Sequence, residues 1–270
     1  MSDTTPLSPL DAGFRSGWGV FETLRAHGTA TLALDAHLER LVAGAARLGI
    51  DADADGVRDE LARTLAAPRE VDEVVVRITV TAGPVDADAW PAVPVGEPTL
   101  AVALHPAPPL PMPPAAAARV ASRRWPADLK TTSYAASILA SREARAAGAD
   151  VAVLTDGDEL LETAEGNLAA LVDGVLVTPP ADGRLLGGVM RALVLEEAVR
   201  AGVHVREAPL RHHDAERADV LLVTSAVAEV RTVHTLDGVA LAGSGHAGTP
   251  LHPLVTTLRT ALSERRAAQG

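Results

Sequence analysis

The chain has 270 residues, of which 47% are hydrophobic and 22% are charged, and its formal net charge at pH 7 is −11. A chain of this length can bury one large core or two smaller ones. The excess of acidic residues argues against a surface for nucleic acid or for an anionic membrane, because both require basic patches. The sequence contains no cysteine, so disulfides and thiolate metal sites are excluded.

Targeting and metal-binding patterns are also missing from the sequence. No apolar run reaches the length that spans a bilayer, and Met1–Leu10 lacks the charged and apolar regions of a signal peptide. The nine histidines are scattered, and without the spacing of metal ligands they predict no metal site. We therefore expect a soluble, cytoplasmic protein.

The part of the chain before residue 105 predicts a mixture of strands and helices. Val20, Thr23 and Leu24 favour a strand that ends near Arg25, after a stretch whose glycines permit tight turns. The other expected elements are a strand at 31–34, a helix at 36–48 capped by Asp35, a helix from a cap at Asp55 to about Leu65, and strands at 74–81 and 99–104.

A proline-rich segment then divides the chain. His105–Pro114 contains six prolines in ten residues, so it can be neither a helix nor a central strand. We expect a small N-terminal domain over residues 1–104, an extended linker over 105–116 and a larger C-terminal domain over 117–270.

The C-terminal part predicts short strands between helices. Asp173-Gly174 is a strong signal for a two-residue hairpin turn. The expected elements are a strand at 118–123, a helix at 137–147, strands at 151–155, 159–161, 167–172 and 175–178, a helix at 189–201, strands at 203–207, 220–224 and 229–234, and a helix at 253–266. Strands mixed with helices and hairpins predict an α+β fold with substantial antiparallel sheet.

Lys130 is the only lysine, since the other 23 of the 24 basic residues are arginines. An arginine stays protonated, whereas a lysine can lose its proton and act as an amine nucleophile or base. A leftover surface cation is an equally good interpretation of the composition alone. Tyr134, the only tyrosine, lies four residues later.

Four other features have both a structural and a functional interpretation. Gly187-Gly188 ahead of a helix can present N–H groups to an anion, although such glycines are more often turn residues. Thr224-Ser225-Ala226 can add donors to the same anion. Glu162 at a strand end and Arg40 on an amphipathic helix are by default solvated charges.

These segments occur in one order along the chain. They are Gly19–Arg25, His37–Leu41 with Arg40, Leu129–Tyr134 with Lys130, Glu162–Asn167, Leu186–Arg191 and Thr224–Glu229. In order and spacing they resemble the class IV aminotransferase family, the pyridoxal-phosphate enzymes of fold type IV. The resemblance covers nearly the whole chain. It implies a small α/β N-terminal domain, a larger C-terminal domain with an antiparallel pseudo-barrel sheet and helices, and a homodimer with active sites between the domains.

The resemblance also implies roles for single residues. Lys130 would form the Schiff base with pyridoxal 5′-phosphate and move the α-proton of the substrate. Glu162, in the same motif as Asn167, would pair with the pyridine nitrogen, and Tyr134 would bind the phenolic oxygen. The residues that would hold the cofactor phosphate are Arg40, Gly188, Val189, Met190, Ser225 and Ala226.

Two positions depart from the pattern of many relatives, because Met190 and Ala226 replace residues with hydroxyl groups. Each lost hydroxyl removes about 1 kcal/mol of net hydrogen bonding. A cofactor-poor, non-catalytic relative is therefore one alternative that the sequence leaves open.

Phe21–Arg25, Arg77–Thr81 and the compact length resemble aminodeoxychorismate lyase and D-amino-acid-aminotransferase-like members. We predict the lyase, which eliminates pyruvate to give p-aminobenzoate for folate biosynthesis; a D- or branched-chain-type amino-acid transaminase is the alternative. Either would act on a small amino-acid-like substrate. Trp18 and Arg77 are candidates for the substrate pocket, although either fits a packing role as well.

Overall fold

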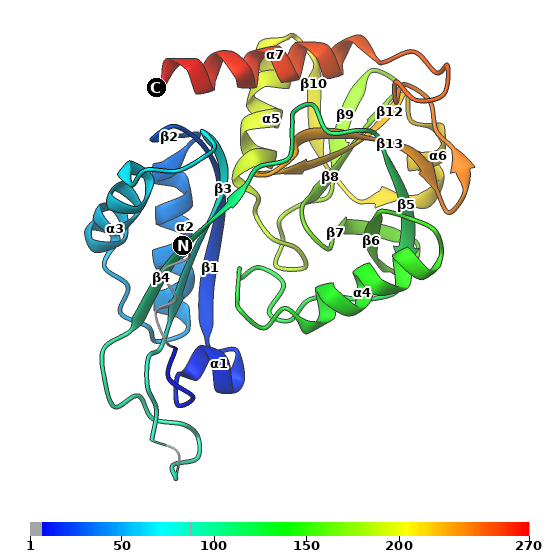
Figure 1. Cartoon of the computed structure of the whole chain (residues 1–270). Helices are drawn as coiled ribbons and strands as arrows, with labels where there is room; N and C mark the ends of the chain where they lie inside the picture. The colour runs from blue at the N-terminus through cyan, green and yellow to red at the C-terminus, as the bar shows by residue number, and fades with distance from the viewer. Residues whose placement is uncertain (1–6, 87, 270) are drawn as a thin grey trace. The chain divides into compact units, whose positions relative to one another are not determined.

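The computed structural model describes residues 7–86 and 88–269 (Figure 1). Residues 1–6, which make up most of the segment that lacks a signal-peptide pattern, lie outside the described residues. The contacts divide the chain into two compact units. The first contains the described residues up to Pro106 together with Leu129–Tyr134, and the second contains Ala107–Asp128 together with the chain from Ala135 onwards. Among the described residues, no helix is both long and apolar enough to cross a bilayer.

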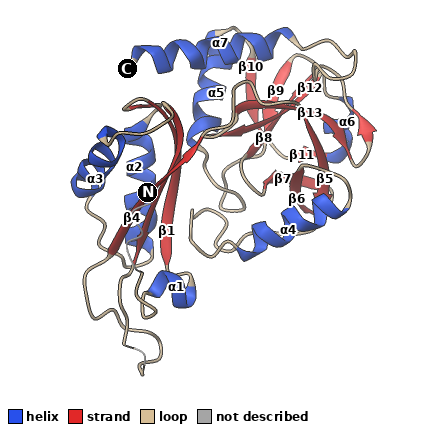
Figure 2. Ribbon diagram, in the orientation of Figure 1, coloured by secondary structure: helices blue, strands red, loops and turns tan. Residues whose placement is uncertain are grey.

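The first unit is a four-stranded antiparallel sheet with two main helices on one face (Figure 2). Its elements are α1 Ala12–Ser16, β1 Gly19–His27, β2 Ala30–Thr31, α2 Leu34–Arg47, α3 Ala54–Ala66, β3 Glu73–Thr81 and β4 Thr99–Pro106, and the strand order is β2-β1-β3-β4. Alternate residues of β3, such as Val76 and Ile78, are completely buried in the core that α2 and α3 share with the sheet.

Both helices begin earlier than the sequence predicted. The α2 helix starts at Leu34 after Ala33, whose φ is 56° and whose side chain provides no cap, so Asp35 lies in the first turn instead of capping the helix. The α3 helix is capped by Asp53, which accepts hydrogen bonds from the N–H groups of Asp55 and Gly56. The prediction that Asp55 caps this helix was wrong, because Asp53 and Asp55 both match the sequence pattern of an N-cap.

The second unit is built on a ten-stranded sheet. Its strands are β5 Ala115–Val120, β6 Val151–Asp156, β7 Glu159–Thr163, β8 Asn167–Val172, β9 Val175–Thr178, β10 His204–Glu207, β11 Leu210–Arg211, β12 Val220–Ser225, β13 Glu229–Leu236 and β14 Val239–Ala240. Its helices are α4 Ala135–Ala146, α5 Val189–Arg200, α6 His212–Arg217 and α7 Pro253–Ala268.

The sheet of the second unit closes on itself. The strand order runs β8-β12-β13-β5-β6-β7, and an additional pairing of β7 with β8 completes the ring. Leu168, Leu221 and Val233 are fully buried in its core. The predicted α+β fold with a barrel-like sheet is confirmed, although β5 runs parallel to both of its neighbours.

Turn chemistry is the feature of this unit that the sequence predicted best. Asp173 and Gly174 have φ values of 50° and 77°, so both residues adopt the left-handed conformation of a two-residue hairpin turn. The hairpin joins β8 to β9 with the strand bounds that were expected. The sequence missed the shortest elements, α1, α6, β11 and β14, because segments of two to six residues are too short to show a period.

Candidate active site

The segment around Lys130 is held against the free edge of β1. The N–H of Phe21 donates to the Lys130 carbonyl and the N–H of Thr132 donates to the Gly19 carbonyl, both at 2.9 Å, around a bridge between Val20 and Thr131. These bonds extend the first sheet by a short antiparallel piece. They explain why Leu129–Tyr134 groups with the first unit, whereas the sequence-based division had placed this segment in the C-terminal domain.

The glycines before β1 allow this segment to approach closely. A Cβ atom on Gly19 would lie 2.8 Å from the Val80 carbonyl, and one on Gly17, whose φ is 66°, would lie 2.5 Å from the Ser133 hydroxyl. The hydroxyl groups of Thr132 and Ser133 both donate to the Gly17 carbonyl, at 2.8 and 3.1 Å. The glycine-rich stretch therefore leaves space for the lysine segment to pack closely against it and provides a carbonyl group that accepts its hydrogen bonds.

Phe21 gathers three functional groups around its ring. The Nζ atom of Lys130 lies 4.6 Å from the ring centroid, and the Cζ atom of Arg77 lies 3.4 Å from it. The Tyr134 ring meets Phe21 edge-on, with 5.5 Å between centroids and an interplanar angle of 81°. An amine, a guanidinium and a phenol are thus brought together by one aromatic side chain.

Strand register explains why Arg77 reaches this ring. Phe21 is paired with Thr79 and Thr23 is paired with Arg77, so Phe21 and Arg77 are diagonal neighbours on one face of the sheet. This face is opposite to the buried residues Val76 and Ile78 of β3. Burial lowers the pKa of Arg77, and the nearby Tyr134 and Glu22 oppose the shift. The guanidinium is a partly dehydrated cation suited to bind a carboxylate.

Arg40 pairs with a buried carboxylate of its own unit. Its Nε and Nη2 atoms donate to the two oxygens of Glu22 at 2.6 and 2.8 Å, and His37 Nδ1 lies 2.8 Å from Glu22 Oε2. Burial of the Glu22 carboxylate raises its pKa, but the hydrogen bonds from His37 and Arg40 outweigh burial and lower the pKa to about 2. The structure therefore shows Arg40 bound to Glu22, and its contact with a cofactor phosphate stays a prediction.

Glu162 is a buried carboxylate with a cationic partner in the second unit. Arg124 donates to Glu162 Oε1 from Nε at 3.0 Å and from Nη2 at 2.7 Å, and the Leu186 N–H donates to Oε2 at 3.2 Å. The carboxylate is thus held in a fixed orientation by a guanidinium and a backbone N–H group. Sequence reasoning missed Arg124, because nothing near it in the sequence distinguishes it from the other arginines.

Asn167 fixes the loop that precedes α5. It stands opposite Glu162 across the β7–β8 pair, and its Nδ2 donates to the Leu186 carbonyl at 2.8 Å. A Cβ atom on Gly188 would lie 1.9 Å from Asn167 Oδ1. The side chains of the Glu162–Asn167 motif therefore position both the Leu186 backbone and the start of the helix.

The start of α5 and the end of β12 offer donors to an anion. Gly188 is the N-cap of α5 without a side-chain hydrogen bond, so the first N–H groups, including those of Val189 and Met190, point out of the helix end. The Ser225 hydroxyl accepts from the Ala228 N–H at 3.1 Å and can itself donate. The buried Thr224 hydroxyl has no partner among the described residues.

Three other predicted positions have simpler environments. The Met190 side chain is buried, so only its backbone faces the helix end. Ala226 follows the end of β12 and adds no side-chain donor. Trp18 packs against the core of the first unit and its indole N–H donates to the Leu48 carbonyl at 2.9 Å, which is a packing role. In the described part of the chain, no cluster of three or more His, Asp or Glu side chains has metal-binding geometry.

Comparisons with known proteins identify the class of enzyme that this architecture belongs to. The family model for amino-transferase class IV matches residues 19–236. A putative branched-chain-amino-acid aminotransferase of Methanocaldococcus jannaschii is 34% identical over 241 residues, which cover 86% of this chain and 83% of the relative. A D-alanine aminotransferase of Listeria monocytogenes is 28% identical with the same coverage. The chain belongs to the class IV aminotransferase family and is a pyridoxal-phosphate-dependent enzyme.

Solved structures support the same fold. A branched-chain aminotransferase of Thermoproteus uzoniensis superposes with a TM-score of 0.87 at 24% identity, covering 99% of this chain and 92% of that one. A putative 4-amino-4-deoxychorismate lyase of Legionella pneumophila gives 0.86 at 23% identity, with coverages of 98% and 97%. At this identity the likeness is one of fold.

The donor set of this chain fits the cofactor. The N-terminus of α5, which has no side-chain cap, and the hydroxyl groups of Thr224 and Ser225 are donors of the kind that a phosphate dianion requires. The buried Glu162 carboxylate has the chemistry that would pair with a pyridine nitrogen, and Lys130 has the amine that would form a Schiff base.

The buried Glu22 carboxylate predicts a specific acid sensitivity. Its pKa in the folded protein, about 2, lies below the 4.5 of an unperturbed glutamate, so its contribution to stability is present above pH 4.5 and is lost as the pH falls towards 2. We expect this one group to remove about 2 kcal/mol from the free energy of unfolding between pH 5.5 and pH 3. Urea denaturation of Glu22→Gln should show a free energy of unfolding that no longer falls by this amount between pH 5.5 and pH 3. At pH 7 the variant should be destabilised by about 3 kcal/mol.

The control for this experiment is Glu60→Gln, which removes a carboxylate from a helix surface pair with Arg63. This variant should keep the pH profile of the wild type. An identical pH profile in Glu22→Gln and the wild type would show that Glu22 is not the titrating group.

The contact between Gly188 and Asn167 predicts that Gly188→Ala weakens cofactor binding. The new methyl group would push Asn167 away from the Leu186 carbonyl and displace the start of α5. We expect at least a tenfold rise in the dissociation constant of pyridoxal phosphate, measured by absorbance titration of the apoenzyme. Gly187→Ala is the matched control, because a Cβ atom there meets nothing within 4 Å. Equal effects of the two substitutions would contradict this explanation.

Proposed function

We propose that this enzyme is an aminotransferase for a small amino acid, with Lys130 as the proton-transfer group and Arg77 as the residue that binds the substrate carboxylate. The observation that carries the proposal is the contact of both cations with the ring of Phe21. An amino acid has a carboxylate next to the carbon that reacts, so an amine and a guanidinium around one ring suit such a substrate. Family members with 34% and 28% identity carry the names of aminotransferases, which supports this reaction.

Each residue of the chain has a distinct task in this proposal. Bound pyridoxal phosphate supplies an electron-withdrawing ring that acidifies the α-carbon of the amino acid. Lys130 removes the α-proton at its Nζ atom and returns a proton to the other reacting carbon. Tyr134, edge-on to Phe21, offers its hydroxyl group to the phenolic oxygen of the cofactor.

The carboxylate of Glu162 keeps the pyridine nitrogen protonated. Arg124 orients this carboxylate through two hydrogen bonds, so it acts as a positioning residue. The phosphate is bound by the N–H groups at the start of α5 and by Ser225, and we retain Arg40 as the further phosphate ligand that the family motif implies.

Aminodeoxychorismate lyase is the second candidate. It is supported by the Phe21–Arg25 pattern and by the fold likeness to the Legionella pneumophila protein. The proton-transfer group and the cofactor partners are the same for both reactions, which differ in the bond that breaks after the α-proton is removed. The two candidates are separated by the products, which makes the assay decisive.

Lys130 is a uniquely simple target for a test of cofactor attachment, because it is the only lysine. We expect purified protein with pyridoxal phosphate to absorb visible light, and borohydride reduction to bleach it and to leave one pyridoxyl group on the Lys130 peptide, as read by mass spectrometry. Lys130→Ala and the charge-preserving Lys130→Arg should lack the adduct and lose activity by at least 1,000-fold. An adduct that persists in both variants would contradict the assignment.

The reaction itself is tested with two substrate panels. D- and L-amino acids with 2-oxo acids should give new amino acids, and aminodeoxychorismate should give no p-aminobenzoate or pyruvate above the Lys130→Ala background. Pyruvate and p-aminobenzoate from aminodeoxychorismate, without transfer in the amino-acid panel, would replace the proposed aminotransferase with the lyase.

Arg77→Met should raise KM for the amino acid by about 30-fold or more with a smaller change in kcat, since a lost charge-assisted pair costs about 2 kcal/mol. Arg77→Lys should recover part of the loss, because it restores the charge without the fork of the guanidinium. Arg63→Met, which removes an exposed arginine on α3, serves as the control. A fall in kcat with unchanged KM would show that Arg77 does not bind the substrate carboxylate.

A further inference from the structure

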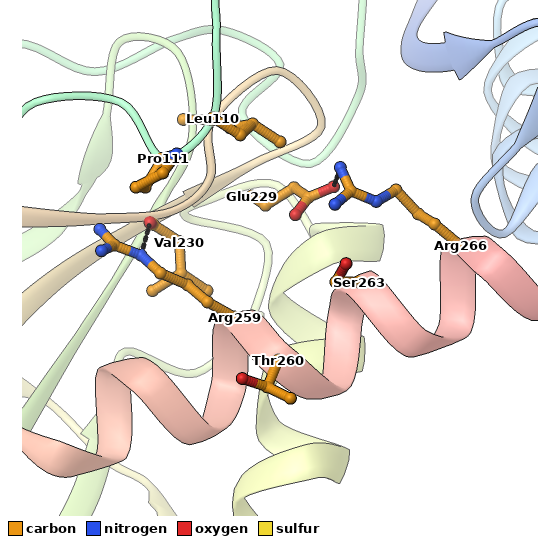
Figure 3. Close-up of a pocket in the computed structure, with 9 residues that line it drawn as sticks. Leu110, Pro111, Glu229, Val230, Arg259, Thr260, Ser263 and Arg266 are labelled. Atoms are coloured by element: carbon orange, nitrogen blue, oxygen red, sulfur yellow. Dashed lines mark hydrogen bonds and ion pairs between the residues drawn. The ribbon is translucent and has the colours of Figure 1, made fainter.

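A pocket with a volume of about 270 Å³ lies in the second unit, between residues 110–111, the beginning of β13 and the helix α7 (Figure 3). Leu110, Pro111 and Val230 form its apolar side, and α7 provides its polar side. All lining residues belong to the second unit, and none of them is among the residues that we assign to the cofactor or to the amino-acid substrate. The pocket is therefore a separate feature of the molecule.

The polar side of the pocket is built on one stripe of α7. Arg259, Ser263 and Arg266 recur at intervals of three and four residues, so they lie on the same face of the helix. Figure 3 shows these side chains along the pocket, with Arg259 turned towards Val230 and Arg266 turned towards Glu229. The helix therefore presents two guanidinium groups and a hydroxyl group to one small volume.

Arg259 differs from the other arginines of this helix in its partners. Arg266 pairs with Glu229 at 2.8 Å, and Arg265 pairs with Glu196 at 3.0 Å and with Glu197. Arg259 has no acidic partner within ion-pair distance among the described residues, and its Nε donates to the Val230 carbonyl at 3.2 Å. This bond fixes the plane of the guanidinium and leaves the two Nη groups to serve a ligand.

The environment of Arg259 favours an anion. The side chain is half-buried, and burial lowers the pKa of the guanidinium by disfavouring its charge. A partly buried cation without a counter-ion costs free energy that a bound anion recovers. Because Glu229 and Arg266 neutralise each other, the pocket carries one net positive charge in a chain whose net charge is −11.

The pocket also selects among anions. One unpaired arginine matches a single negative charge, and the Glu229 carboxylate on the wall disfavours a dianion such as phosphate. The apolar side formed by Leu110 and Pro111 matches a ligand with a hydrophobic body. The Ala228 N–H beside the pocket donates to the Ser225 hydroxyl, so the pocket lies one hydrogen bond away from a predicted phosphate ligand.

We propose that this pocket is a binding site for a small organic monocarboxylate with an apolar body, whose carboxylate pairs with Arg259 and whose body packs on Leu110 and Pro111. Ser263 donates its hydroxyl group to the same carboxylate. The ligand class follows from the single unpaired charge and the apolar wall, and it does not depend on the reaction that the enzyme catalyses.

The test uses 4-fluorobenzoate and the full-length enzyme saturated with pyridoxal phosphate, with fluorine NMR as the readout. We expect saturable line broadening in the wild type and at least a tenfold weaker interaction in Arg259→Met. Arg206→Met is the matched control, since it removes an exposed arginine from β10 in the same unit and should leave binding unchanged. The uncharged 4-fluorobenzyl alcohol should bind at least tenfold more weakly than the carboxylate.

A second variant protects the test against misfolding of the first. Ser263→Leu leaves Arg259 unchanged and places leucine, a good helix former, at an exposed position of α7. The leucine side chain fills the pocket and should therefore also block the probe. Circular dichroism and the bound-cofactor spectrum establish that each variant is folded.

Four outcomes would overturn the proposal. The first is the absence of saturable binding in the wild type, and the second is binding that survives in Arg259→Met or in Ser263→Leu. The third is loss of binding in Arg77→Met, which would place the probe in the substrate site. The fourth is displacement of the probe by inorganic phosphate more strongly than by acetate. Failure of this test leaves the aminotransferase assay untouched, because that assay depends on Lys130 and Arg77.

Discussion

The backbone pairing between β1 and the Lys130 segment is the constraint on which the first half of the site depends. A lysine side chain is a flexible chain of four methylene groups, so its amine can be positioned only if its backbone is fixed. Hydrogen bonds on both sides of Val20 and Thr131 provide that fixation, and the glycines before β1 leave room for it. Phe21, on the same strand, then sets where the amine lies relative to Arg77.

Paired buried charges are the second organising principle. Glu22 in the first unit and Glu162 in the second are both nearly inaccessible, and each accepts two hydrogen bonds from a single arginine. A buried carboxylate without such a partner would take up a proton. The hydrogen bonds from His37 and Arg40 keep Glu22 ionised and join α2 to β1, and Arg124 holds the Glu162 carboxylate in a fixed orientation.

The sequence predicted those features that depend on local chemistry. The hairpin at Asp173-Gly174 and the start of α5 after Gly188 follow from residues within a few positions of each other. The features it did not predict are contacts between distant segments. Arg124 and Glu162 are 38 residues apart, and the ion pair between Arg40 and Glu22 spans 18 residues, so no pattern in the sequence reveals either. The hydrogen bond from the Trp18 indole to the Leu48 carbonyl likewise joins residues that are 30 positions apart.

The same distinction bears on the phosphate anchor. Met190 and Ala226 suggested a weak anchor when only side-chain hydroxyl groups were counted. In the structure the Met190 side chain belongs to the core, while the helix end to which it contributes its N–H carries no side-chain cap. Thr224, which the sequence did not single out as a separate ligand, has a buried hydroxyl beside Ser225 that meets no hydrogen-bond partner in the described part of the chain. Backbone donors at a helix end are supplied by the fold whatever the side chain, so the two missing hydroxyl groups leave the N–H groups at the start of α5 available to the phosphate that we propose binds there.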